Sequence, residues 1–128
     1  MIVLQVLTIV EAATFGLAAL LHLGLPLGVA EPVIVPAAVV ESLAATVLGF
    51  SAWALVARRP WAQSVTLAAY AFAVGGVLLG MGALAAGRGP QTDLNTVYHR
   101  LILAALLSGV VLQIWLQRGR VTAARWES

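Results

Sequence analysis

The chain has 128 residues, of which 62% are hydrophobic and only 9% are charged, and its mean hydropathy is +1.00. A soluble domain of this length cannot bury so many apolar side chains, because too little polar surface would remain to face water. The absence of cysteine excludes a disulfide, a dithiol redox pair and a thiolate metal site. The net charge of +2 does not indicate a nucleic-acid partner, because the arginines lie where a membrane topology would place them.

Four long apolar runs follow one another, at approximately residues 2–25, 33–57, 61–86 and 94–117. Each has the roughly 20 residues that a helix needs to cross a bilayer core of about 30 Å. We therefore predict an all-α fold: an integral membrane four-helix bundle that forms one transmembrane domain over residues 1–128. The connections "ARRPW" and "GRGPQTD" are short, so sequential helices should be antiparallel neighbours in an up-down-up-down order.

The first run carries two polar side chains, Glu11 and His22. Glu11 falls near the bilayer midplane, and at about 100° per residue the two side chains lie within roughly 20° of each other on one helix face. The following "PLGVAEP" resembles a signal-peptidase site at Ala30. No basic residue precedes the run and it is longer than a usual signal-peptide core, so we expect a retained membrane helix.

The second and third runs combine isolated polar residues with small ones. Glu41 shares a face with several alanines of the second run, and Tyr70 is expected to line the bundle interior from the third. The third run also has a stripe of small residues that includes Gly76 and Gly80. Such a stripe favours close helix packing, either inside the bundle or between chains. We predict a homo-oligomer or a subunit of a larger membrane complex.

The fourth run begins with "DLNTVYHRLILAALLSG". Asn95 and His99 share the face that should turn inward, whereas Arg100 points about 100° away. Arg100 is therefore expected to extend to the lipid headgroups, or to pair with Asp93 or Glu31.

The arginines indicate the orientation of the bundle. The connection between runs two and three and the segment after run four hold most of them, whereas the other two connections hold only Arg88. The positive-inside rule then places both termini in the cytoplasm, in what we expect to be a bacterial cytoplasmic membrane. The residues near that face are Arg58, Arg59, Arg118, Arg120 and Arg125, together with Trp53, Trp61, Trp115 and Trp126.

His22, Glu41 and His99 should lie at similar depth in the extracytoplasmic half, and we predict them as the ligand-binding or metal-binding centre. Such side chains cost about 2.5–3.5 kcal/mol each inside a membrane, so they indicate a partner or a purpose. Two histidines could hold haem b between helices, and Glu41 could add a third ligand for a single transition metal. A hydrogen-bonded trio without a cofactor is the alternative. The supporting polar residues are Glu31, Tyr70, Asp93, Asn95 and Arg100.

Glu11 offers a different chemistry. In chain length, helix count and the single midplane carboxylate of "LTIVEAATFG", the chain resembles the small multidrug resistance transporters. The resemblance implies proton-coupled transport of a lipophilic cation, with Glu11 as the proton-coupling residue. It extends no further, because the aromatic and proline pattern of that family's second and third helices is absent.

Motifs for catalysis are lacking: the sequence has no nucleotide-binding loop and no recognisable Ser/His/Asp set. We therefore expect a non-enzymatic binding or accessory subunit with a polar site inside the membrane. Proton-coupled transport and a purely structural assembly role are the alternatives.

Overall fold

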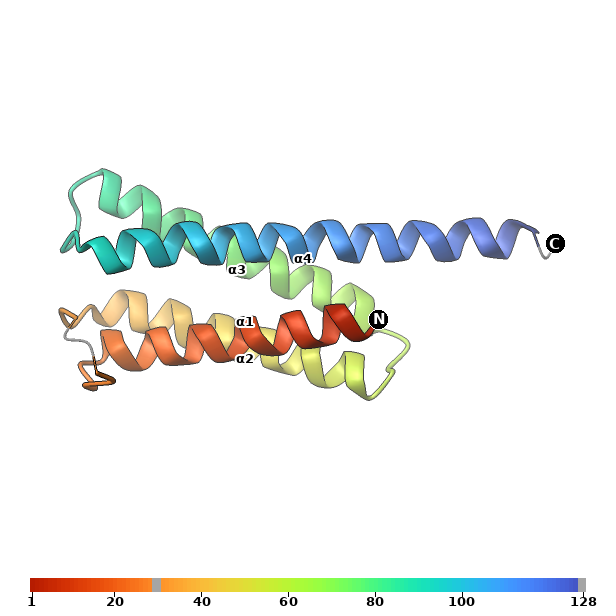
Figure 1. The fold of residues 1–128 in the computed structure, drawn as a ribbon, viewed down its shortest axis with the longest axis horizontal. Helices are drawn as coiled ribbons and strands as arrows, with labels where there is room; N and C mark the ends of the chain where they lie inside the picture. The colour runs from red at the N-terminus through yellow and green to blue at the C-terminus, as the bar shows by residue number, and fades with distance from the viewer. Residues whose placement is uncertain (29–30, 127–128) are drawn as a thin grey trace.

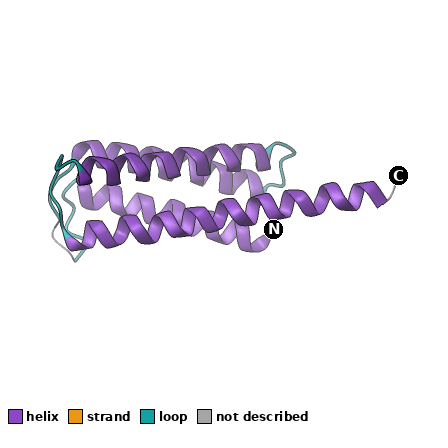
Figure 2. Cartoon of the chain, turned by 90° about the horizontal axis from the view of Figure 1, so that it is seen from above, coloured by secondary structure: helices purple, strands orange, loops and turns teal. Residues whose placement is uncertain are grey.

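The computed structural model describes the backbone of residues 1–28 and 31–126 and the side chains of residues 1–28 and 31–118. Within this part the chain forms four helices, α1 (Ile2–His22), α2 (Val35–Val56), α3 (Ala62–Ala85) and α4 (Asp93–Trp126). Each contains a stretch long and apolar enough to cross a membrane. The helices run back and forth, and both termini lie toward the same end of the bundle (Figures 1 and 2). The predicted all-α, four-helix membrane bundle is confirmed.

Local backbone signals explain where the first three helices end. The chain adopts positive φ just after each of them, at Gly24 (φ 86°), Arg58 (φ 51°) and Gly87 (φ 71°). At each end, an amide hydrogen bond reaches back across the last helical turn, as when the Arg88 N–H donates to the Ala83 carbonyl at 2.9 Å. The last two of these endings produce the tight reversals that make α2, α3 and α4 antiparallel neighbours.

Helix α4 differs most from its predicted bounds, because it continues to Trp126 rather than ending near residue 117. Only Asp93–Arg118 is apolar enough to span the membrane, and the polar continuation projects beyond the other helices (Figure 1). Hydropathy marks only the part of a helix that lies in lipid. A helix that continues with polar residues beyond the membrane is therefore longer than its apolar run. The side chains of Arg120, Arg125 and Trp126 lie outside the described residues.

The helices form a ring in chain order, with α1 also packed against α4. Helix α3 is oblique: it runs from the end of α2 toward the start of α4 (Figure 1). Its Tyr70 is fully buried, and a Cβ on Gly109 of α4 would overlap the tyrosine ring. Gly109 thus allows α3 and α4 to approach at this crossing. Farther along α3, toward its C-terminal end, space is left between α3 and α2.

An aromatic cluster marks the end of the bundle where α2 meets α3. The rings of Phe50, Trp53 and Trp61 lie 5.4–6.1 Å apart, and the Arg59 guanidinium lies 5.3 Å from the centre of the Trp53 ring. All three rings are 40–50% exposed. Half-exposed tryptophans beside arginine are typical of a membrane–water interface.

The orientation of the bundle can be tested with single cysteines, because the native chain has none. Gln91→Cys, in the exposed connection between α3 and α4, should react with a membrane-impermeant maleimide in intact cells. Ser128→Cys, beyond the described residues, should react only after the cells are lysed. The reverse pattern would place the termini outside and contradict the arginine-based orientation.

Candidate functional site

Two of the three predicted site residues form a buried pair. The Nδ1 atom of His22 at the end of α1 lies 2.7 Å from Oε2 of Glu41 on α2, and the two residues are only 4% and 5% exposed. The backbone brings them together, because the Ile34 N–H before α2 donates to the His22 carbonyl at 2.9 Å. The pair therefore joins the C-terminal end of α1 to the N-terminal part of α2.

His99, the third predicted residue, does not join this pair. Its Nδ1 donates to the backbone carbonyl of Asn95, one turn earlier in α4, at 2.8 Å. Its Nε2 faces α3, where a Cβ added to Gly80 would lie 3.0 Å away. Of the hydrogen-bonded trio that the sequence offered as the alternative to a cofactor, the described residues contain only the His22–Glu41 bond, because the His99 Nδ1 bonds to the Asn95 backbone carbonyl inside α4.

The geometry gives no support to the predicted haem or metal centre. Among the described residues, no group of three or more His, Asp or Glu side chains is placed to hold a metal ion. The two histidines also line different cavities, one with His99 and the other with His22. A haem between them would need both imidazoles to face one space.

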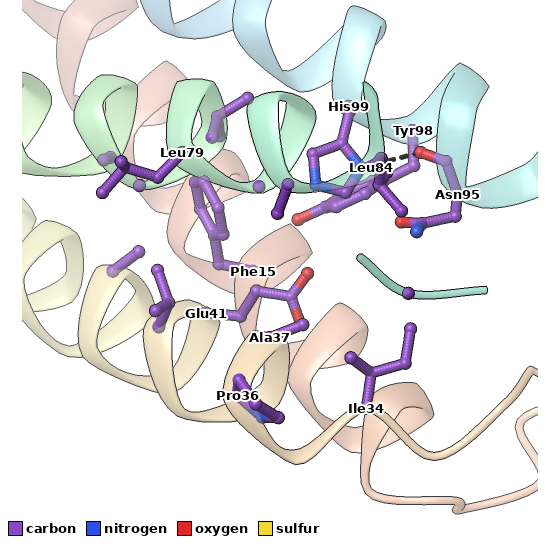
Figure 3. Close-up of a pocket in the computed structure, with 18 of the residues that line it drawn as sticks. Phe15, Ile34, Pro36, Ala37, Glu41, Leu79, Leu84, Asn95, Tyr98 and His99 are labelled. Carbon is purple, nitrogen blue, oxygen red and sulfur yellow. Dashed lines mark hydrogen bonds between the residues drawn. The ribbon is translucent and has the colours of Figure 1, made fainter. Parts of the chain in front are cut away.

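The larger cavity has a volume of about 280 Å³ and lies between α2 and the second half of α3. Most of its wall is apolar, with Phe15 of α1 at its base (Figure 3). Four polar side chains gather at the end near the start of α4, and Arg88 contributes from the connection before that helix. These four are Glu41, Asn95, Tyr98 and His99.

Two of these polar groups lack a hydrogen-bond partner in the described part of the chain. They are the side-chain amide oxygen Oδ1 of Asn95 and the hydroxyl oxygen of Tyr98, and both atoms are buried. Asn95 as a whole is only 5% exposed. Leaving a buried polar group unpaired costs about 1–3 kcal/mol, so such groups generally indicate a missing water, ion or ligand.

The small residues of α3 form one wall of this cavity. A Cβ on Gly76 would lie 2.9 Å from Cγ1 of Val40 on α2, and Gly80 faces His99 as described above. At these two glycines the stripe packs within the bundle, which is the first of the two alternatives that the sequence offered. The homo-oligomer stays a prediction, without the support of these two positions.

A smaller cavity of about 160 Å³ lies on the other side of Asn95 and Tyr98, beside His22. It is lined by Glu31, whose Oε2 accepts a hydrogen bond from the Thr92 hydroxyl at 2.9 Å. This bond joins the connection between α1 and α2 to the connection between α3 and α4. Asn95 and Tyr98 therefore separate the two cavities.

The remaining supporting residues have different surroundings. Asp93 and Arg100 are exposed, and the salt bridge found among the described side chains is that of His22 with Glu41, so Arg100 pairs with neither Asp93 nor Glu31. Its exposed position fits the alternative expectation of a headgroup anchor.

Glu11 and Tyr70 form a separate, deeper group. Glu11 is 1% exposed, and its carboxyl oxygens make no direct hydrogen bond within the described chain. The Tyr70 hydroxyl lies 3.0 Å from the Thr8 hydroxyl and close enough to Glu11 for an electrostatic interaction. Tyr70 thus accompanies Glu11 rather than His99.

Tyr98 is the site residue that sequence reasoning did not select. In "NTVYHR" it follows Asn95 by three positions, the spacing that places two side chains on neighbouring helix positions. That signal was present, but one tyrosine beside a histidine is no motif.

Comparisons of the chain with protein-family models, curated proteins and solved structures find no match.

The buried pair predicts that removing His22 alone costs more stability than replacing both partners. His22→Ala should destabilise the protein by about 3 kcal/mol, because it leaves the Glu41 carboxyl buried without its partner. Adding Glu41→Gln to His22→Ala should restore part of this loss, since a neutral amide is cheaper to bury than a carboxylate. Unfolding in mixed micelles with increasing dodecyl sulfate measures both changes.

Thr46→Ala is the matched control, because Thr46 is an exposed polar residue on α2, the helix of Glu41, and its hydroxyl donates to the Ser42 carbonyl one turn earlier. This variant should change the stability by no more than about 0.5 kcal/mol. A His22→Ala variant as stable as the native chain would show that the pair does not hold α1 to α2.

Proposed function

We propose that this protein is a non-enzymatic membrane protein that binds the polar end of a small lipophilic molecule between α2 and α3. The observation that carries the proposal is the apolar cavity that ends at Asn95 and Tyr98, two groups buried without partners. Ligand sites are typically apolar spaces with a few convergent polar groups. A bound head group would supply the missing hydrogen bonds.

The cavity volume limits the part of a ligand that fits. At about 30 Å³ for each water-sized unit, a cavity of about 280 Å³ holds roughly nine such units. This is enough for a small head group and the first several carbon atoms of a chain. A longer chain would continue into the lipid along the outside of the bundle.

The cavity rim favours entry from the bilayer. Leu79 of α3 is 76% exposed and Val40 of α2 is 37% exposed, and both line the cavity. Exposed leucine and valine on membrane-spanning helices face lipid, so a molecule dissolved in the bilayer would reach the cavity laterally. With the orientation predicted from the arginines, the polar end lies in the outer half of the cytoplasmic membrane.

A binding role fits the hydrogen bonds that the acid–base side chains make. His22 and Glu41 are hydrogen-bonded to each other, and the His99 Nδ1 is bonded to its own helix. These contacts fix side-chain positions and present a recognition surface. An accessory subunit that delivers or holds a lipophilic molecule within a larger complex is the fuller form of this proposal.

The proposal is tested by photolabelling the protein in nanodiscs with a dodecanol analogue that carries a diazirine in mid-chain. We expect saturable labelling of cavity residues on α2 and α3, with competition by unlabelled dodecanol. Ala83→Phe should reduce this labelling at least about tenfold, because Ala83 lines the cavity and the larger ring would occupy the space.

Ala71→Phe is the control for the same substitution, because Ala71 lies on α3 but is exposed and does not line the cavity. This variant should label like the native chain. Labelling that is spread over lipid-facing residues, and that neither saturates nor changes in Ala83→Phe, would refute the binding site.

Proton-coupled transport is a second candidate, favoured by the buried, unbonded carboxyl of Glu11. In this case the native chain in proteoliposomes should take up tetraphenylphosphonium in response to an imposed pH gradient. Glu11→Gln should abolish that uptake, since an amide cannot exchange a proton. If the native chain shows no uptake that depends on the gradient, Glu11 has a structural role.

A further inference from the structure

The hydrogen-bonding groups at the polar end of the cavity differ in whether they can still donate or accept a hydrogen bond. His99 is informative, because its Nδ1 contacts a carbonyl oxygen, which can only accept a hydrogen bond. Nδ1 therefore carries the proton. In a neutral imidazole the other nitrogen, Nε2, is then an acceptor, and it points toward the α3 wall of the cavity at Gly80.

The neighbouring groups add further acceptors. The Asn95 Oδ1 atom is an acceptor that lacks a donor in the described chain. Glu41 uses Oε2 for His22, and its carboxyl group is turned toward the side chains of α4 at this end of the cavity (Figure 3). Carboxylate oxygens accept hydrogen bonds and have no proton to donate.

Donors are also present among the cavity-lining side chains, since the Asn95 amide nitrogen Nδ2 carries two N–H groups. The Tyr98 hydroxyl can donate or accept, and it is unbonded. Arg88 can only donate, but it is exposed in the connection before α4, where water and lipid headgroups compete for it. The polar end therefore holds both kinds of group, but two of its acceptors, Asn95 Oδ1 and His99 Nε2, receive no hydrogen bond within the described chain.

We propose that the ligand's head group is a hydrogen-bond donor, of which a hydroxyl group on a lipophilic chain is the simplest example. Such a group would donate to Asn95 or His99 and accept from Tyr98. This inference rests on the proposed binding function and specifies its ligand class. It excludes head groups that only accept, such as ethers, esters and ketones, because they would leave the Asn95 oxygen and the His99 nitrogen unpaired.

A matched pair of competitors tests the inference on the native chain. Dodecanol and dodecyl methyl ether have the same alkyl chain and an oxygen at the same place, but only dodecanol has a hydroxyl proton. Each would compete with the diazirine probe in nanodiscs, at equal concentrations in the bilayer. We expect dodecanol to compete at least about tenfold more strongly, the ratio for one net hydrogen bond of about 1.4 kcal/mol.

Asn95→Leu examines one acceptor directly. This variant should bring the two competitors closer together, because its side chain accepts no hydrogen bond. Ser108→Leu makes the same kind of change at an exposed position of α4 and should keep the native preference. If Asn95→Leu does not fold, the comparison of the two competitors on the native chain still decides the question.

The outcomes separate this inference from the binding proposal. If the ether competes as well as the alcohol, the head group need not be a donor, and this inference is wrong while the binding site stands. If neither molecule competes with the probe at the cavity residues, the binding site itself is wrong. A stronger effect of the alcohol, reduced in Asn95→Leu but kept in Ser108→Leu, supports both.

Discussion

The structure depends on one constraint: inside hydrocarbon, a polar side chain must find its partner within the protein. Most hydroxyl groups meet it locally, as Thr8 and Thr66 do by donating to carbonyl oxygens one turn back, at 2.8 Å each. His22 and Glu41 meet it across two helices. The side chains that do not meet it are then few, and they are informative about function.

These unsatisfied groups lie in three places, of which one, formed by Gln63 Nε2 and Gln113 Oε1, is near the start of α3. Asn95 and Tyr98 are at the end of a cavity, so a ligand that enters the cavity has room to pair with them. Glu11 is buried beside Tyr70, and it does not line either of the two cavities described above. This difference is why the cavity carries the main proposal and Glu11 the second one.

The cavity results from the path of α3. In the first half of this helix Tyr70 packs over Gly109 of α4, and the helix then runs obliquely toward the start of α4 (Figure 1). Gly76 and Gly80 leave the wall of α3 smooth, with Val40 and His99 in direct contact range of their backbone. A small-residue stripe, which often indicates dimerisation, here borders an internal space.

The sequence was sufficient to predict the helices and their order, because about 20 apolar residues between short polar turns allow few other arrangements. It also placed Glu11 and His22 on one inward face, and both are buried. The pairing of Glu41 with His22 could not be predicted from the sequence. Glu41 had two histidines available, and the choice of His22 depends on how α1 and α2 meet, which hydropathy does not encode.

The cavity and the length of α4 were unpredictable for related reasons. A cavity arises from the crossing angle of α3, and that angle depends on side-chain packing at positions such as Gly109. The end of α4 lies beyond the membrane-spanning segment, where the apolar pattern used to delimit the helices no longer applies. Tyr98 became a site residue only when the helices were placed in space.

The central claim is that the His99 Nε2 atom is an acceptor that awaits a donor. Solid-state NMR of the protein in lipid, labelled with ¹⁵N at its two histidines, measures this atom directly, and a His22 variant assigns the signals. The account predicts a non-protonated Nε2 whose resonance shifts when dodecanol is added and stays in place with dodecyl methyl ether. A protonated Nε2 in the free protein would contradict it.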